Sequence, residues 1–539
     1  MNRVEIKRKQ ILGFTQLLWI ITWVVLGRMI CDNGVTYLAV AIEGMSFMVS
    51  LLAERVPDAL GRMLRGRYAR GQFKNADIVK RGALIWQAVW AAIGGSVLFL
   101  LAGILTEKVF LIPYGMLAMR ILSVAVTVRV LSCVFLGYFQ GRGVQIPTIM
   151  VAVLRQLFYL GLCILFVNKL KAYGAKVEPL LLDDALSSMY GAAGMAAAIV
   201  VTELFLLLFI VLLYLGSHKK KEEQGLKRTE NFVSTVTGLF GNAAPYTTVD
   251  LLVRMPVWLG LLFYMRAFGQ AENAEWVYGT YYSGYLLVMS IPIIIVSCLL
   301  HPLAARTAVS ARKGESRLAK DIAGASLHGG FCGGLFLTVM FAVLHKQFAS
   351  IFAVREVADV MIVAEVTVSD MICKGSPVIL FAILSGVCIR ILIYMGKNSK
   401  VLCSLFGYVA AFVIGAWLCL HTWELDIAGL VYGVCIAAAV LCLVSGFLVI
   451  RQLRIKMNLL YWFAIPMGAA AVSGLICIVL EKILASHMGT AVLIVCLPIS
   501  MIVYLAVLIL FHSFDRQEFE YLPGGKLLFG LCEMVGIKL

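Results

Sequence analysis

Seven ionisable side chains interrupt long apolar stretches of this sequence, where a charge is costly. They are Glu43, Arg129, Arg155, Glu203, Asp250, Arg254 and, closer to the outer face, Arg28. A charged side chain near the middle of a membrane costs about 2.5–3.5 kcal/mol on insertion scales, so such residues usually face a cavity or pair with one another. We therefore expect these positions to include the groups that bind a ligand or an ion.

Four of the seven residues are arginines, which suit an anionic ligand. A guanidinium group forms two parallel hydrogen bonds with phosphate oxygens, as a diphosphate would require. The predicted substrate-binding residues are Arg28, Arg129, Arg155 and Arg254. The structural alternative is that these side chains reach toward the membrane surface or pair with an acid such as Glu43 or Glu203.

The three acidic residues, Glu43, Glu203 and Asp250, are the predicted sites of ion coupling or gating. Asp250 and Arg254 lie four residues apart, so they share one helix face and can pair with each other. Such a pair has two interpretations, a structural ion pair that neutralises itself or a gate. The sequence leaves both open.

The composition indicates a protein that crosses a membrane many times. Of its 539 residues, 61% are hydrophobic and 14% are charged, whereas soluble domains have about 25% charged residues. Apolar runs of about 20 residues, the length that spans a bilayer, fill most of the chain. We predict an all-α polytopic membrane protein with fourteen transmembrane helices.

Other classes of protein and site are disfavoured. The net charge of +16 resides in short loops between apolar runs, which is typical of membrane topology rather than of nucleic-acid binding. The fourteen cysteines lie mainly in apolar runs and show no metal-binding spacing. We expect no metal, no cofactor, no cleaved signal peptide and, without an acid/base cluster on a long loop, no enzyme.

The predicted spans follow one another with short connections. They cover residues 10–30, 35–53, 82–104, 115–138, 147–168, 190–215, 233–264, 278–300, 324–345, 375–395, 401–420, 427–450, 459–480 and 490–511. Residues 54–81 and 301–321 are predicted as basic loops that contact anionic lipids, and residues 346–373 as a short or broken helix. Lys and Arg are concentrated in alternate loops and at both ends, so both termini are predicted to be cytoplasmic.

Two parts of the chain resemble each other and indicate an internal repeat. Gly137 to Val167 reads as a helix end, a turn with Gly141 and Gly143, and a new helix that begins near Pro147. The same order recurs around Gly396, which we align with Gly141. Residues 71–84 likewise match residues 314–327.

The repeat predicts four regions. They are a six-helix half at 1–216, a basic cytoplasmic linker at 217–231, a second six-helix half at 232–450, and two extra helices with a cytoplasmic tail at 451–539.

These features resemble the multidrug/oligosaccharidyl-lipid/polysaccharide (MOP) exporter superfamily, and within it the fourteen-helix branch of polysaccharide and lipid II flippases and stage V sporulation protein B. The resemblance rests on the two halves, the added helices, and the motifs around Gly27-Arg28, Phe139-Gln140-Gly141, Arg155-Gln156 and His301-Pro302. It implies a V-shaped, monomeric transporter of a bacterial cell membrane that works by alternating access.

The same resemblance implies the substrate, a lipid-linked sugar or cell-wall precursor on undecaprenyl diphosphate. The alternative is a multidrug antiporter of the same superfamily that is coupled to H⁺ or Na⁺ through Glu43 or Asp250. Because no nucleotide-binding loop is present, an ion gradient or the membrane potential would drive either process. We interpret Tyr281, Tyr282 and Tyr285 as an aromatic belt at the membrane surface, with stacking on sugars as the alternative.

Overall fold

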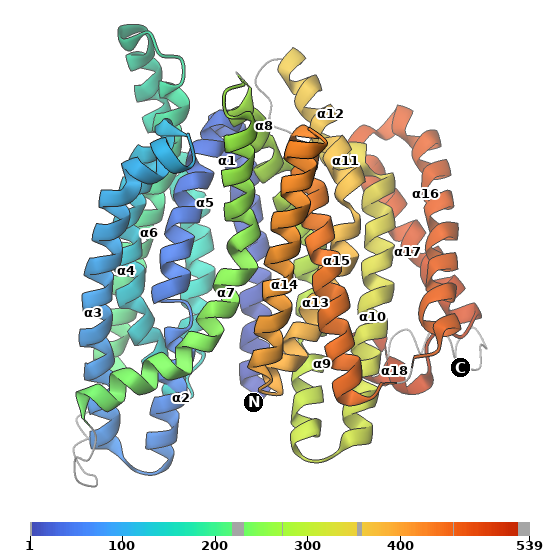
Figure 1. Ribbon diagram of the computed structural model, residues 1–539, viewed down its shortest axis with the longest axis horizontal. Coiled ribbons are helices and arrows are strands. Elements are labelled where there is room, and N and C mark those ends of the chain that lie inside the picture. Colours follow the sequence, from blue (N-terminus) through green and yellow to red (C-terminus); the bar gives the residue numbers. More distant parts are fainter. Residues whose placement is uncertain (1–2, 218–230, 272, 353–357, 456, 526–539) are drawn as a thin grey trace. The chain divides into compact units, whose positions relative to one another are not determined.

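The computed structural model describes residues 3–217, 231–271, 273–352, 358–455 and 457–525 (Figure 1). Helices form the regular structure of these residues, and no strand occurs among them. The predicted linker at 217–231 lies almost entirely outside the described residues, as does the end of the predicted cytoplasmic tail.

The first eight helices precede residue 283. They are α1 (Arg3–Leu52), α2 (Val56–Ala69), α3 (Phe73–Gly103), α4 (Met116–Gly141), α5 (Ile146–Leu181), α6 (Leu186–Ser217), α7 (Phe232–Phe268) and α8 (Ala274–Thr280). The others are α9 (Leu287–Arg312), α10 (Ser316–Val343), α11 (His345–Phe352), α12 (Ala358–Gly375), α13 (Pro377–Tyr394), α14 (Asn398–Trp417), α15 (Asp426–Leu453), α16 (Ile465–Met488), α17 (Val492–Leu510) and α18 (Arg516–Tyr521).

The prediction of fourteen transmembrane helices is confirmed. Fourteen segments of the described residues are long and apolar enough to cross a membrane. Helix α1 supplies the first two, because the backbone at Cys31 is not helical and separates Lys7–Cys31 from the span that begins at Asn33. The predicted broken helix at 346–373 corresponds to α11 and α12, between which residues 353–357 are not described.

The prediction of long basic loops is wrong. Within 54–81 the chain forms α2 and the start of α3, and within 301–321 it continues α9 to Arg312 before α10 begins. Helix α2 forms because Pro57 occupies its first turn, where a missing N–H is tolerated. Its apolar face, which includes Leu60 and Leu64, packs against α4. The loop was predicted from the positive charge of the segment, much of which belongs to the arginines of α2.

Four tight turns have the same hydrogen-bond pattern. The glycines at their centres, Gly71, Gly143, Gly314 and Gly396, have φ values of +70°, +81°, +83° and +76°. In each turn the glycine N–H binds the carbonyl three residues back, and the next N–H binds the carbonyl five residues back. This is the Schellman arrangement, which needs a left-handed residue and therefore favours glycine. The turns come in two pairs, as expected for the predicted repeat.

The structure corrects which glycine forms the turn after α4. Gly143 has the left-handed conformation and corresponds to Gly396, whereas we had aligned Gly141 with Gly396. Gly141 is the last residue of α4, and a Cβ atom placed there would lie 2.6 Å from Cβ of Leu64. Gly141 is thus required for the close packing of α4 on α2, not for reversal of the chain.

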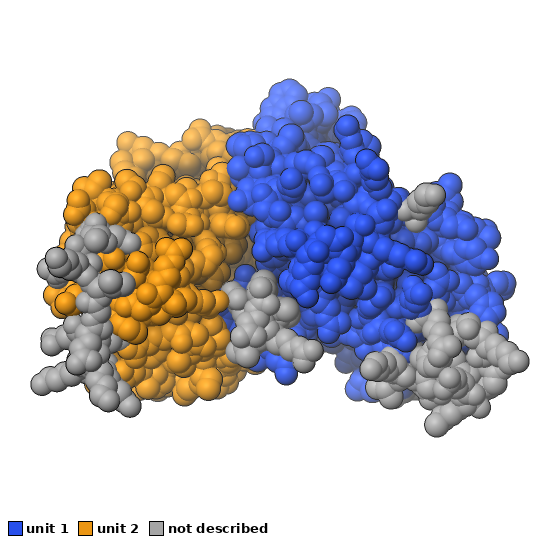
Figure 2. Space-filling view, turned by 90° about the horizontal axis from the view of Figure 1, so that it is seen from below, with its two compact units in different colours: residues 1–17, 283–539 blue, residues 18–282 orange. Residues whose placement is uncertain are grey.

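The chain divides into two compact units, shown in different colours in Figure 2. We call residues 18–282 the N-terminal unit and residues 1–17 with 283–539 the C-terminal unit. One boundary lies within α1, and the other lies within a π-helical turn, Tyr281–Leu286. The predicted division into halves at 1–216 and 232–450 rests on the sequence repeat and stays a prediction.

Each unit is a bundle of packed helices. In the N-terminal unit, α3, α4, α5 and α6 run side by side, and α7 packs on α2 and α3 (Figure 1). In the C-terminal unit, α16 and α17 pack against each other and α16 packs on α10. A buried cluster that includes Phe336, Met340 and Val492 joins these helices, and the hydroxyl of Tyr504 donates a hydrogen bond of 2.9 Å to the Cys332 carbonyl.

Candidate functional site

All seven predicted site residues belong to the N-terminal unit. Arg129 lies near the middle of α4, Glu203 near the middle of α6, and Asp250 near the middle of α7. The structure connects six of the seven through a network that also includes residues missed by sequence analysis. Arg28 is exposed at the end of the first span, and its predicted role stays a prediction.

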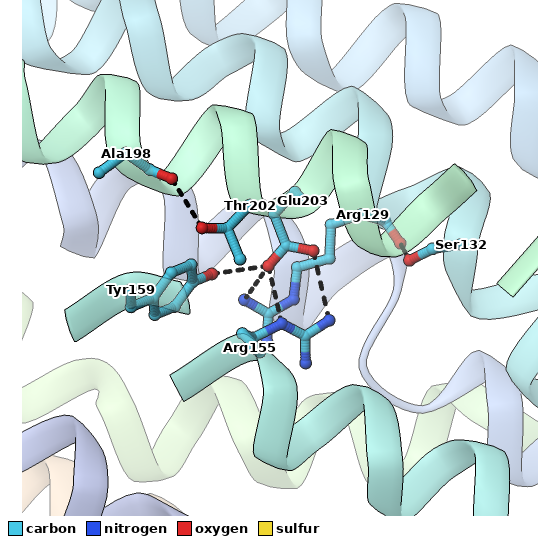
Figure 3. A network of polar contacts seen from close by, with 7 residues as sticks. All are labelled: Arg129, Ser132, Arg155, Tyr159, Ala198, Thr202 and Glu203. Atoms are coloured by element: carbon cyan, nitrogen blue, oxygen red, sulfur yellow. Dashed lines mark hydrogen bonds and ion pairs between the residues drawn. The ribbon is translucent and has the colours of Figure 1, made fainter. Parts of the chain in front are cut away.

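Glu203 is the centre of a buried cluster formed by α4, α5 and α6 (Figure 3). The Arg155 Nε donates to Glu203 Oε1 at 2.8 Å, and Arg155 Nη2 donates to Oε2 at 3.3 Å. The Tyr159 hydroxyl donates to Oε1 at 2.6 Å. Because Arg155 and Tyr159 are four residues apart on α5, both side chains face the same carboxylate. We call these residues, together with Arg129, the Glu203 cluster.

Arg129 is the more weakly held arginine of this cluster. Its Nη1 lies 3.7 Å from Glu203 Oε1, beyond hydrogen-bond distance. It also interacts electrostatically with Glu54. The structure therefore contains the expected alternative, an Arg–Glu pair, for Arg155 and Glu203. The side chain of Arg129 is 30% exposed.

A second cluster joins the α1–α2 turn to α7. Arg55 donates from Nε and Nη2 to the two carboxylate oxygens of Asp250. Glu54 accepts a hydrogen bond of 2.8 Å from the Ser50 hydroxyl, and its Oε2 lies 3.8 Å from Arg254 Nη2. We call Ser50, Glu54, Arg55, Asp250 and Arg254 the clasp.

The clasp corrects the predicted pairing of Asp250 with Arg254. Each of the two residues pairs with a different neighbour in the α1–α2 turn, and the neighbours are consecutive in sequence. The turn brings Glu54 and Arg55 to α7 together. Glu54 therefore lies beside Arg254, and Arg55 binds Asp250. Both Glu54 and Arg55 lie in the segment predicted as a basic loop. An acid–base pair that directly follows an apolar run and precedes Pro57 is the signal that would have identified them.

Glu43 has a neutral partner in the described residues. The Tyr282 hydroxyl donates to Glu43 Oε1 at 2.7 Å, and the Tyr282 ring lies 5.2 Å from that of Trp23. Tyr281, Tyr282 and Tyr285 are all buried, so their interpretation as a surface belt is wrong. Tyr281 and Tyr282 lie at the start of the π-helical turn, a kind of irregularity that is frequent at functional sites.

A further pair of carboxylate contacts was also missed. The Tyr37 hydroxyl donates to Glu275 at 2.7 Å, and the Tyr114 hydroxyl donates to Asp183 at 2.9 Å. The two tyrosine rings lie 5.3 Å apart. Tyrosine is therefore the recurring neutral partner of acids in this unit, and nothing in the sequence spacing indicates it.

Exposure differs between the two members of most ion pairs. The side chain of Arg55 is 32% exposed and that of Asp250 is 13% exposed. Arg129 is 30% exposed, while Glu203 is fully buried. The pair of Arg254 and Glu54 is the exception, at 40% and 42%. In the pairs Arg55–Asp250 and Arg129–Glu203, the arginine is thus more exposed than the acid, whereas Arg155, the closest partner of Glu203, is only 13% exposed.

Among the described residues, no group of three His, Cys, Asp or Glu side chains is placed to hold a metal ion. The cysteines of the same residues are free thiols.

Known structures have the same fold. A multidrug-resistance MATE-family transporter of the MOP superfamily, in an inward-facing conformation, matches with a TM-score of 0.64 and 14% identity over 82% of this chain and 94% of that one. A MOP-superfamily transporter from Pyrococcus furiosus, described as having a binding pocket of reverse polarity, matches with a TM-score of 0.59 and 14% identity over 83% and 95%. The eukaryotic MATE transporter AtDTX14 matches with a TM-score of 0.58 and 15% identity over 83% and 95%.

No protein-family model matches the sequence, and no curated protein sequence matches it. The three solved structures show that the chain has the fold of MOP-superfamily transporters. They cover 82–83% of this chain and 94–95% of their own chains.

Proposed function

We propose that this chain, which has the fold of MOP-superfamily transporters, moves an anionic lipid-linked substrate across a cytoplasmic membrane. The proposed substrate is an oligosaccharide or cell-wall precursor carried on undecaprenyl diphosphate. The group that the protein would recognise is the diphosphate, because arginine binds phosphate oxygens through paired, charge-assisted hydrogen bonds.

The observation that carries the proposal is the unequal exposure of the ion pairs. In the clasp and in the Glu203 cluster, the acids Asp250 and Glu203 are more buried than the arginines that they hold. A site for cationic drugs would favour the opposite arrangement, with exposed carboxylates above buried bases. The arrangement present supports an anion as the ligand.

The proposed mode of action is alternating access. The two predicted halves would alternate between an inward-open and an outward-open state, as in other transporters built from repeats. Glu43 is the best candidate for ion coupling, because its described partner is a neutral hydroxyl and not an arginine. Glu203 and Asp250, each held by an arginine, suit a gate. We further propose a monomer with both termini cytoplasmic, in a bacterial membrane whose anionic lipids contact α2 and the α9–α10 turn.

A specific observation favours the second candidate, a multidrug antiporter. The rings of Trp19, Trp23, Tyr159 and Tyr282 form a continuous series, with centroid separations of 5.2–5.8 Å. This series joins the Glu203 cluster to Glu43, and aromatic faces beside a carboxylate attract organic cations.

The experiment that separates the two candidates measures binding to purified full-length protein in detergent. The probes are an undecaprenyl-diphosphate-linked sugar and ethidium. The variants are Arg254→Gln and Glu43→Gln, and the control is Asp370→Asn, which removes a similar exposed pair with Lys374 in the C-terminal unit. Arg155 is unsuitable as the main test, because its loss would leave Glu203 buried without its closest partner.

Saturable binding of the lipid-linked sugar that Arg254→Gln weakens about tenfold, and that the control leaves unchanged, is the expected result. Binding of ethidium that depends on Glu43, with no affinity for the lipid-linked sugar, would replace the proposal with the antiporter.

A further inference from the structure

Two arginines of the N-terminal unit hold their acids loosely. Arg129 lies 3.7 Å from Glu203, and Arg254 lies 3.8 Å from Glu54. Arg155, by contrast, donates to Glu203 at 2.8 Å, and Arg55 holds both oxygens of Asp250. The tight pairs fasten helices together, whereas the loose pairs leave two guanidinium groups with capacity for another anion.

Glu54 lies within the field of both loosely held arginines. It contacts Arg254 directly, and Arg129 acts on it electrostatically. Unlike Glu203 and Asp250, Glu54 is as exposed as its arginine partner. An exposed ion pair at this distance is weak. The Glu54 carboxylate can therefore move away from Arg254 without leaving a buried charge unpaired.

The surroundings of Glu54 allow its side chain to move while its backbone stays in place. The Glu54 N–H binds the Val49 carbonyl at 3.0 Å, and the next residue, Arg55, is anchored to Asp250. The Ser50 hydroxyl, which donates to Glu54 at 2.8 Å, is a neutral donor that an incoming oxygen can use equally well.

We infer that Glu54 is a resident counter-ion, which occupies the place of a diphosphate beside Arg254 and Arg129 and is displaced when that group arrives. The inference rests on the proposed function and specifies where the diphosphate binds. A diphosphate carries more charge than a carboxylate and can engage two arginines at once, so it outcompetes Glu54. When the ligand leaves, Glu54 again neutralises Arg254, which keeps the empty site from attracting other anions.

Glu54→Gln tests the inference, because glutamine keeps the size of the side chain and removes the competing charge. The probe is farnesyl diphosphate, a short lipid diphosphate, and its binding to purified full-length protein is measured by calorimetry. Uncharged farnesol tests the lipid part alone, and phosphatidylglycerol vesicles test a monophosphate headgroup. Asp370→Asn is the matched control, and the thermal unfolding of each variant confirms that it is folded.

We expect Glu54→Gln to bind farnesyl diphosphate about fivefold more tightly than the wild type, since an exposed ion pair competes by about that factor. Arg254→Gln should weaken binding in both backgrounds, and farnesol binding should not change. The headgroup preference of the Glu54→Gln protein then distinguishes a diphosphate site from a general site for anionic lipids. Equally tight binding of phosphatidylglycerol would indicate a general site and overturn the inference.

Failure of the inference and failure of the proposed function give different results. If the wild type binds farnesyl diphosphate through Arg254 and Glu54→Gln leaves the affinity unchanged or lowers it, only the resident counter-ion is refuted. If neither protein binds the diphosphate, and Glu54→Gln instead weakens ethidium binding, both the inference and the proposed function are wrong.

Discussion

Arg55 donates two hydrogen bonds to Asp250, which lies 195 residues further along the chain. This contact fastens the α1–α2 turn to α7 inside the N-terminal unit. It also assigns Asp250 a partner other than Arg254, its neighbour on the same helix. The contact therefore separates Arg55 and Asp250, which we propose as part of a gate, from Arg254, for which we propose a ligand-binding role.

The Arg55–Asp250 contact should make a measurable contribution to stability. We expect Asp250→Asn and Arg55→Gln each to lower the free energy of unfolding by about 1.5–3 kcal/mol, the usual range for hydrogen bonds to charged groups. The double variant should be less destabilised than the sum of the two, with a coupling energy of about 0.5–3 kcal/mol. Unfolding in detergent, followed by tryptophan fluorescence, measures all three. Strictly additive losses would show that the pair does not interact.

The loss of stability on mutation of each member of the Glu203 cluster should follow the closeness of its contact with Glu203. Arg155→Ala should destabilise the protein by about 3–5 kcal/mol, because it leaves the buried carboxylate of Glu203 without its closest partner. Tyr159→Phe removes one hydrogen bond and should cost about 1 kcal/mol. Arg129→Ala should cost less than Arg155→Ala, since its contact is 3.7 Å long and its side chain is partly exposed. A larger loss for Arg129 than for Arg155 would contradict this order.

Glu43 should affect transport more than ligand binding. In proteoliposomes, Glu43→Gln should abolish the dependence of transport on a proton or sodium gradient, while equilibrium binding of a diphosphate lipid should change less than twofold. Tyr282→Phe, which removes the hydroxyl that donates to Glu43, should shift that dependence without abolishing it. Unaltered gradient dependence in Glu43→Gln would exclude this residue as the coupling site.

The glycine turns permit a test with a matched control. Gly143→Ala and Gly396→Ala should each cost about 1–2 kcal/mol, because both positions have a left-handed backbone. Gly141→Ala should also be destabilising, but for a different reason, the contact with Leu64. Leu64→Gly, which removes the Cβ atom at 2.6 Å, should therefore partly rescue Gly141→Ala and should not rescue Gly143→Ala. Thermal unfolding of the four single variants and two double variants checks this, and equal rescue at both positions would be inconsistent with the structure.

His345 should make part of the stability dependent on pH. It lies outside the membrane spans, where burial and the nearby Lys346 lower the pKa of its imidazole below 6.5. A lowered pKa means that the folded protein prefers neutral histidine, so this contribution is complete above pH 6.5 and is lost as the pH falls. The negative charges of Glu481 and Asp370 act in the opposite direction and raise the pKa of His345. His345→Gln should flatten the loss of stability between pH 7 and pH 5, and an unchanged slope would assign that loss to other groups.

Much of the fold was predictable because its signals are local. A span must contain about 20 apolar residues whatever its neighbours are, so the fourteen spans could be counted along the chain. The charged residues inside those spans were identifiable for the same reason, since each one violates the apolar pattern at its own position. The predicted repeat rests in part on turns that favour glycine, and the choice between Gly141 and Gly143 required the backbone angles.

The partners of the charged residues depended on the tertiary structure. Glu203 lies 48 residues from Arg155, and Asp250 lies 195 residues from Arg55; an apolar pattern carries no information about which helix faces which. The local rule of four-residue spacing favoured Asp250 with Arg254, but packing of the α1–α2 turn on α7 offered each of them a closer partner. The exposure of each member of an ion pair also depended on the tertiary structure, because only the packed helices determine which side chain is covered and which is accessible.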